Sequence, residues 1–131
     1  MRVIKEIVKK YPLSCACIAL IWVLCFIPVP DLHLDHVTLL DKWVHALMYA
    51  GTCAVIWMEY LRRHTKKANK RRLLLFAWLT PVLMSGVIEV LQEYCTFGIR
   101  GGDWRDLVAN TTGATLSLCG GMLYLWFRAR E

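Results

Sequence analysis

A set of charged and polar residues interrupts an otherwise apolar chain, and their side chains are of the kinds that bind ligands or transfer protons. They are Asp41, Lys42 and His45; Glu89 and Gln92; and Arg100, Asp103, Asp106 and Asn110. Carboxylates and imidazoles can hold a divalent metal, or they can act as general acid and base. Lysine, arginine and the flexible Gly101-Gly102 pair instead favour an anionic group such as a phosphate.

We predict acid–base or metal-binding roles for Asp41, His45 and Glu89. The other predicted ligand-binding residues are Lys42, Tyr49, Gln92, Arg100, Asp103, Asp106 and Asn110. The sequence specifies neither a metal nor a cofactor. It contains no H-E-x-x-H, G-x-S-x-G or P-loop pattern, so no named catalytic mechanism follows from it.

The elements that must position these residues are predicted to be membrane helices. Hydrophobic residues make up 57% of the 131 residues, and the mean hydropathy is +0.43. Both values are high for a soluble domain. Four apolar segments are each long enough to cross a bilayer, at about 11–29, 42–61, 73–94 and 107–127. The sequence therefore predicts one all-α domain over 1–131, a four-helix transmembrane bundle, with a kink at Pro81 and a basic amphipathic arm over 1–10.

The charges predict how this bundle is oriented. The segment 62–72 carries seven Lys and Arg, whereas 31–41 carries none. By the positive-inside rule, segment 62–72 and both termini are cytoplasmic. The net charge of +6 then faces anionic lipid and does not indicate nucleic-acid binding. The first segment is interpreted as an uncleaved anchor, because no cleavage pattern follows it. We expect a multi-pass protein of the bacterial inner membrane.

Helical spacing gathers the polar residues under the outer surface of the membrane. Asp41, His45 and Tyr49 share one face of the second span, and Glu89 shares a face of the third span with Ser85 and Gln92. Asn110 lies on the fourth span at a similar depth. Charged side chains are costly in lipid, so we expect these three faces to turn toward one another. Small residues at four-residue spacing, Ala46 to Ala54 on the second span and Gly113 to Gly121 on the fourth, support the inward turn, because such stripes let helix backbones approach closely.

Structural roles are the competing interpretation of the same residues. Asp103 and Asp106 match a helix capping box, and Asp41 could cap the second span. Glu89 could form a static ion pair with Arg100 or Arg105. A capping role does not exclude a second role in binding.

Three patterns, in this order, resemble the VanZ-like family. They are Asp41-Lys42-x-x-His45, Glu89-x-x-Gln92, and Arg100-x-x-Asp103-x-x-Asp106-x-x-x-Asn110-x-x-Gly113, and the resemblance covers roughly 35–127. It implies a small bacterial integral membrane protein with a role in the cell envelope. The namesake of the family is associated with resistance to the glycopeptide teicoplanin. The resemblance implies no reaction.

Three functions remain open from the sequence. The first is a binding protein whose outward-facing polar site engages a lipid headgroup, a lipid-linked cell-wall precursor or a glycopeptide-related ligand. The second is a membrane-embedded hydrolase or transferase acting on an envelope lipid, with or without a metal. The third is a small transporter, which is ranked last because no internal repeat is visible.

Overall fold

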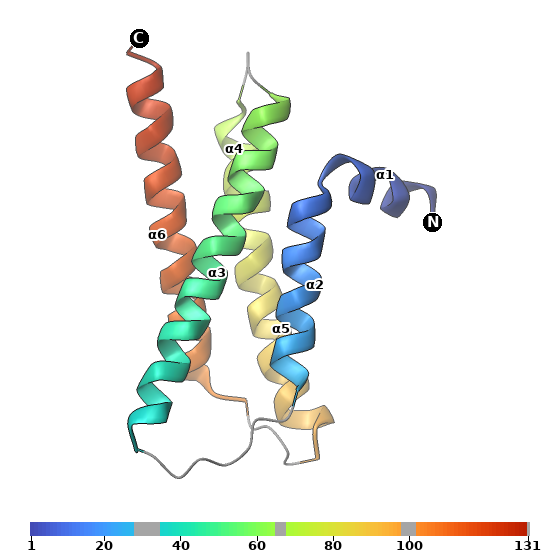
Figure 1. Ribbon diagram of the computed structural model, residues 1–131, viewed down its shortest axis with the longest axis vertical. Coiled ribbons are helices and arrows are strands. Elements are labelled where there is room, and N and C mark those ends of the chain that lie inside the picture. Colours follow the sequence, from blue (N-terminus) through green and yellow to red (C-terminus); the bar gives the residue numbers. More distant parts are fainter. Residues whose placement is uncertain (28–34, 65–67, 98–101, 131) are drawn as a thin grey trace.

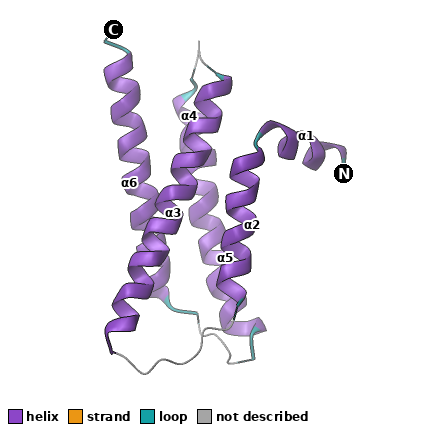
Figure 2. Cartoon of the chain, viewed as in Figure 1, coloured by secondary structure: helices purple, strands orange, loops and turns teal. Residues whose placement is uncertain are grey.

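The computed structural model describes residues 1–27, 35–64, 68–97 and 102–130, and within these ranges it is helical without a strand (Figures 1 and 2). The side chains of 35–38 are not described. The elements are α1 (Arg2–Lys10), α2 (Pro12–Phe26), α3 (Asp35–Arg63), α4 (Lys70–Leu74), the π-helical turn η1 (Leu75–Leu79), α5 (Thr80–Cys95) and α6 (Trp104–Arg128). The predicted all-α class is confirmed.

The two N-terminal helices meet at a sharp bend of 105°. The bend lies at Tyr11, whose backbone leaves the helical region (φ −133, ψ 62). Proline at the next position explains this, because its ring disfavours helical geometry in the residue before it. The arm predicted over 1–10 is thus a separate helix with every residue exposed. Helix α2 ends at Phe26, three residues before the predicted end of the first span.

Helices α3 and α6 form the most extensive contact in the structure. Gly113 of α6 lies directly against the backbone of Ala46 on α3, where a Cβ atom would collide with the Ala46 carbonyl. The close approach of helix backbones that such small residues allow is therefore present between these two helices. Helix α3 begins at Asp35, seven residues before the predicted start of the second span. Asp41 consequently lies inside the helix, and the expectation that it caps this helix is wrong.

The third predicted span is a continuous helical run from Lys70 to Cys95 with one irregular turn. The π-helical turn η1 ends immediately before Thr80 and Pro81. Proline cannot donate to the carbonyl four residues earlier, and its ring would clash with it, so the preceding turn widens. The Thr80 hydroxyl donates to the Leu75 carbonyl at 2.9 Å within that wider turn.

A buried carboxylate joins α2 to α3. Glu59 accepts hydrogen bonds from the Leu13 and Ser14 amides at 3.1 and 2.9 Å, and from the Ser14 hydroxyl at 2.6 Å. These amides belong to the first turn of α2, which has no earlier carbonyl partners and carries the positive end of the helix dipole. Glu59 therefore caps α2 from a neighbouring helix.

Helices α2, α3, α5 and α6 run along one long axis with their ends gathered in two groups, whereas α1 points sideways from the start of α2 (Figure 1). At the lower end in the figure lie the start of α3, the start of α6 and the end of α5. Toward the upper end lie the C-terminus, the start of α2 and the end of α3, which leads to α4. The residues predicted to form the site are thus carried to one end, away from both termini.

Within the described ranges, one helical run, Lys70–Cys95, is long and apolar enough to span a membrane, with a mean hydropathy of 1.9. The bent pair of α1 and α2 meets the same criterion if it is counted as one span. Helices α3 and α6 have 29 and 25 residues, which gives lengths of about 43 and 37 Å. They are long enough to cross a bilayer, but their charged, small and hydroxyl residues lower their mean hydropathy.

Candidate functional site

The candidate site lies where α3, α5 and α6 meet at the lower end of the bundle (Figure 1). Its centre is the Lys42 ammonium group, which donates to Asp103 Oδ2 at 3.0 Å and to Asp106 Oδ1 at 2.9 Å. Asp103 precedes α6 and Asp106 lies in its first turn, so this lysine clamps the start of α6 to α3. The side chains are only partly exposed, with 26% for Lys42 and 14% for Asp106.

Three potential metal ligands lie beside this ion pair. Asp41, His45 and Asp106 each offer one ligand atom, and these atoms all lie within 4.8 Å of one another. His45 Nε2 is 3.8 Å from Asp41 Oδ1, one helical turn away on α3. His45 is buried, whereas Asp41 and Asp106 are partly exposed. Carboxylate and imidazole groups in this arrangement can hold a divalent cation, and they can also receive an ammonium or hydroxyl donor.

Two glutamates of α5 hold the backbone that leads into α6. Glu89 Oε2 accepts from the Asp103 amide at 2.9 Å, and Glu93 Oε2 accepts from the Gly102 amide at 2.9 Å. Asp103 caps α6 as predicted, since its side chain accepts from the Arg105 amide at 2.9 Å. The predicted capping box is absent, because Glu89 and not Asp106 receives the Asp103 amide.

These contacts leave little capacity for an external anion. The Arg105 amide and the Lys42 ammonium keep the Asp103 carboxyl ionised, and they lower its pKa below the ordinary value near 3.8. The amides at the start of α6 and the Lys42 ammonium already bind protein carboxylates. The expectation that Lys42 and this helix start would bind a phosphate is therefore not supported by the geometry. Among the described residues the acidic side chains outnumber the cationic ones here. The site therefore favours a ligand that offers hydrogen-bond donors.

A second layer of polar groups lies deeper in the bundle. Asn110 is 2% exposed, and its Nδ2 donates to the Ser85 hydroxyl at 2.7 Å. Tyr49 is fully buried, and its hydroxyl lies near the same serine. Within the described residues, His45 Nδ1, the Tyr49 hydroxyl and Asn110 Oδ1 are buried and have no hydrogen-bond partner. Buried polar atoms are rarely left unpaired, so this layer has the character of a binding site for water or a polar ligand.

The structure does not bring every predicted residue to this place. Gln92 is buried and donates from Nε2 to the Cys25 carbonyl at 2.7 Å, so it fixes the end of α2 to α5. This hydrogen bond gives Gln92 a structural role, and its role in ligand binding stays a prediction. Arg100 lies outside the described residues. Among those described, Glu89 forms no ion pair with Arg105, and its observed partner is a backbone amide.

Two residues at the site were not assigned to it from the sequence. Ser85 receives the Asn110 amide, and Glu93 holds the Gly102 amide. Ser85 lies one turn before Glu89 on the same face of α5, so its spacing carried a signal. Glu93 carried none, because its role depends on the path of the backbone before α6.

Comparisons with protein-family models, with curated proteins and with solved structures give no match to this chain.

Proposed function

We propose that the chain is a VanZ-like integral membrane protein of the bacterial cell envelope, folded as a four-helix transmembrane bundle. The distribution of side chains supports this proposal. Buried positions include polar residues, namely Ser14, Thr52, Ser85, Gln92 and Asn110, while large apolar side chains are exposed along the helices. Exposed examples are Leu47 on α3, Leu83 on α5 and Leu116 on α6, each more than half exposed. Such a surface is stable in lipid and aggregates in water.

The proposed orientation places both termini and the basic segment 62–72 in the cytoplasm of the bacterial cell, with the polar site on the outer side of the inner membrane. The positive-inside rule supports this direction. The arrangement in Figure 1 agrees with it, because the C-terminus, the end of α3 and the start of α2 lie toward the same end of the bundle, opposite the site. A cysteine-accessibility map that places residue 68 outside would contradict this orientation.

The proposed activity is binding of an envelope ligand, either a polar lipid headgroup or a lipid-linked cell-wall precursor, through its hydroxyl or ammonium donors. One observation carries this proposal: Asp41 and Asp106 lie beside the buried His45, next to acceptor atoms that have no hydrogen-bond partner in the described part of the chain. The second layer of polar groups, at Asn110 and Ser85, would form hydrogen bonds with further polar groups of the ligand. A role in glycopeptide resistance would follow if that ligand is the precursor that glycopeptides recognise.

The test is retention of envelope lipids by the protein purified in detergent, measured by native mass spectrometry. We expect Asp106→Asn and His45→Ala to lose the bound headgroup lipid by about tenfold, which corresponds to about 1.4 kcal/mol. The matched control is Glu6→Gln, which neutralises an exposed acid of α1 far from the site. Equal retention by all four proteins would refute the binding proposal.

A second candidate function is a metal-dependent hydrolase or transferase acting on an envelope lipid. The observation that favours it is the grouping of Asp41, His45 and Asp106 within 4.8 Å. It ranks second because the Lys42 ammonium already occupies Asp106 at 2.9 Å, and a divalent cation would have to displace it. Zinc or manganese that copurifies with wild type and is lost in His45→Ala, together with headgroup release lost in the same variant, would favour the enzyme over the binding protein.

A further inference from the structure

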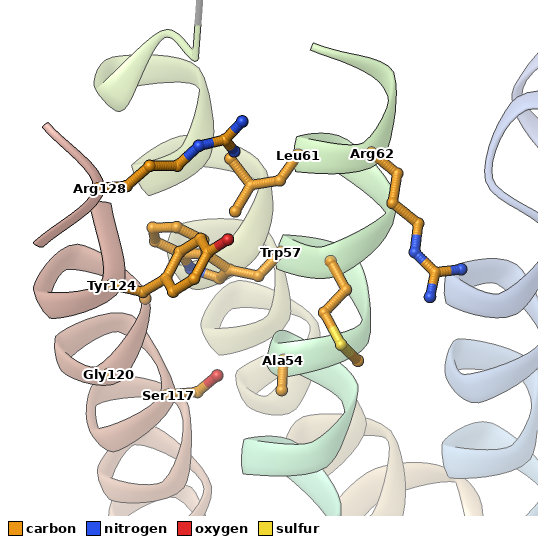
Figure 3. Close-up of a pocket in the computed structure, with 10 residues that line it drawn as sticks. Ala54, Trp57, Leu61, Arg62, Ser117, Gly120, Tyr124 and Arg128 are labelled. Carbon is orange, nitrogen blue, oxygen red and sulfur yellow. The ribbon is translucent and has the colours of Figure 1, made fainter. Parts of the chain in front are cut away.

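A groove lies between α3 and α6 at the end of the bundle opposite the polar site. Its volume is about 690 Å³. Its α3 wall includes Ala54 and Trp57, and its α6 wall includes Ser117, Gly120 and Tyr124 (Figure 3). The lining is mostly apolar, and none of the residues predicted for the polar site contributes to it. The groove is therefore a separate feature that the proposed headgroup site does not use.

Glycines give the groove its shape. A Cβ atom on Gly121 would enter the Trp57 indole ring, so this glycine lets the tryptophan lie flat against α6. A Cβ atom on Gly120, one residue earlier, would meet nothing within 4 Å. The Trp57 side chain thus fills the space beside Gly121, whereas the space beside Gly120 is open. Polar atoms at the groove, Trp57 Nε1 and Ser117 Oγ, are buried without a hydrogen-bond partner within the described residues.

Arginines lie at the end of the groove. Arg128 extends from α6 toward Leu61, across the end of the groove, and the guanidinium of Arg62 lies on the other side of α3 (Figure 3). Among the described residues neither arginine forms an ion pair. An apolar groove that ends at an unpaired guanidinium is complementary to an amphipathic molecule with an anionic head.

We propose that this groove binds one anionic phospholipid of the inner leaflet, with an acyl chain along the groove and the phosphate on Arg128. The proposal rests on the membrane orientation proposed above, which places this end of the bundle at the cytoplasmic surface. The anionic lipids of that leaflet attract basic side chains.

The length of the groove fits this occupant. From Ser117 to Arg128 the axis of α6 advances by about 16 Å. Half of a bilayer core is about 15 Å thick, which is the reach of an acyl chain within one leaflet. The guanidinium then lies at the headgroup level while the chain passes Tyr124 and Trp57.

The experiment measures lipid retention in detergent by native mass spectrometry, with phosphatidylglycerol or phosphatidylcholine added at equal concentration. Wild type is expected to retain one phosphatidylglycerol, and to retain phosphatidylcholine at least about fivefold less. Gly120→Phe fills the groove and is expected to lower retention of both lipids by about tenfold. Arg128→Gln is expected to remove the preference for phosphatidylglycerol while leaving the acyl contacts.

The matched control is Gly86→Phe, which adds the same ring to α5 at a helical glycine that also has open space around it. Its lipid retention should equal that of wild type.

Unchanged lipid retention in both Gly120→Phe and Arg128→Gln would overturn the proposal. A protein dimer that dissociates in Gly120→Phe would also overturn it, because a second copy of the chain would then occupy the groove. Asp106→Asn should keep this lipid, so loss of the headgroup site and loss of the groove site are distinguishable. Retention in detergent does not depend on orientation, so a reversed topology would reassign the leaflet without altering the binding result.

Discussion

Helices α3 and α6 build two different environments at their two ends. At the polar end Gly113 meets the Ala46 backbone, and Lys42 joins α3 to the carboxylates of α6. At the other end Trp57 packs closely against Gly121 of α6, and a groove remains beside Gly120. One helix pair can thus be closely packed at one end and leave a groove for a ligand at the other. The difference depends on whether the facing side chains pack against and pair with each other.

The largest effect on stability is expected from adding a methyl group at Gly113. Gly113→Ala places a methyl group against the Ala46 carbonyl, so α3 and α6 must separate. We expect the free energy of unfolding to fall by about 3 kcal/mol, at the upper part of the range for overpacked sites. The measurement is denaturant or thermal unfolding in detergent.

The matched variant for that experiment is Gly120→Ala, on the same helix, where Gly120 lines the groove between α3 and α6. Its Cβ meets open space, so it should be neutral or stabilising by up to about 1 kcal/mol, because alanine favours the helix. Equal destabilisation by the two variants would show that the two ends of the helix pair do not differ in packing.

A smaller effect is expected from removing the cation of the polar end. Lys42→Met leaves Asp103 and Asp106 facing each other without a counter-charge. We expect a loss of about 1 kcal/mol in the free energy of unfolding, because the pair is partly exposed. The same variant should bind divalent cations more tightly, which isothermal titration with Mn²⁺ would measure. Weaker Mn²⁺ binding in Lys42→Met would show that the acids do not act as a cation site.

The smallest effect concerns acid stability. The pKa of Asp103 is lower in the folded state than its ordinary value, so its contribution is present at neutral pH and is lost as the pH falls through the folded pKa. We therefore expect the unfolding temperature to fall below about pH 4. Asp103→Asn keeps a side-chain oxygen for the Arg105 amide but loses this titration, so its decline over the same range should be shallower. Parallel declines in both proteins would contradict the assignment.

Helical spacing recovered much of the site because it depends only on the backbone period. It placed Asp41 and His45 one turn apart on α3, and it placed Ser85, Glu89 and Gln92 on one side of α5. Helical spacing could not predict which neighbouring helix each face would contact. Gln92 shares the polar face of Glu89, yet it points to the end of α2, and only the packing of α2 against α5 decides that.

The capping interaction at α6 shows the same limit. The residue types around Asp103 predicted a cap, and the cap is present. The partner of the Asp103 amide is Glu89, which lies 14 residues away. A local pattern cannot predict it, because the hydrogen bond depends on how the chain returns from α5 to α6. The groove beside Gly120 was likewise unpredicted, because the sequence does not show whether a neighbouring helix fills the space beside a helical glycine.

The all-helical class, the approximate positions of the four longest helical segments, and the polar residues that each carries on one face could all be predicted from the sequence. These properties follow from hydropathy and a helical period of 3.6 residues, which are local. The tertiary structure decided which charges neutralise one another and which remain available to a ligand. It joined Lys42 to Asp103 and Asp106, and it formed the groove beside Arg128. Among the described residues it left His45 Nδ1 and Asn110 Oδ1 buried without a hydrogen-bond partner. These depend on distances between helices, which no spacing along one helix can fix.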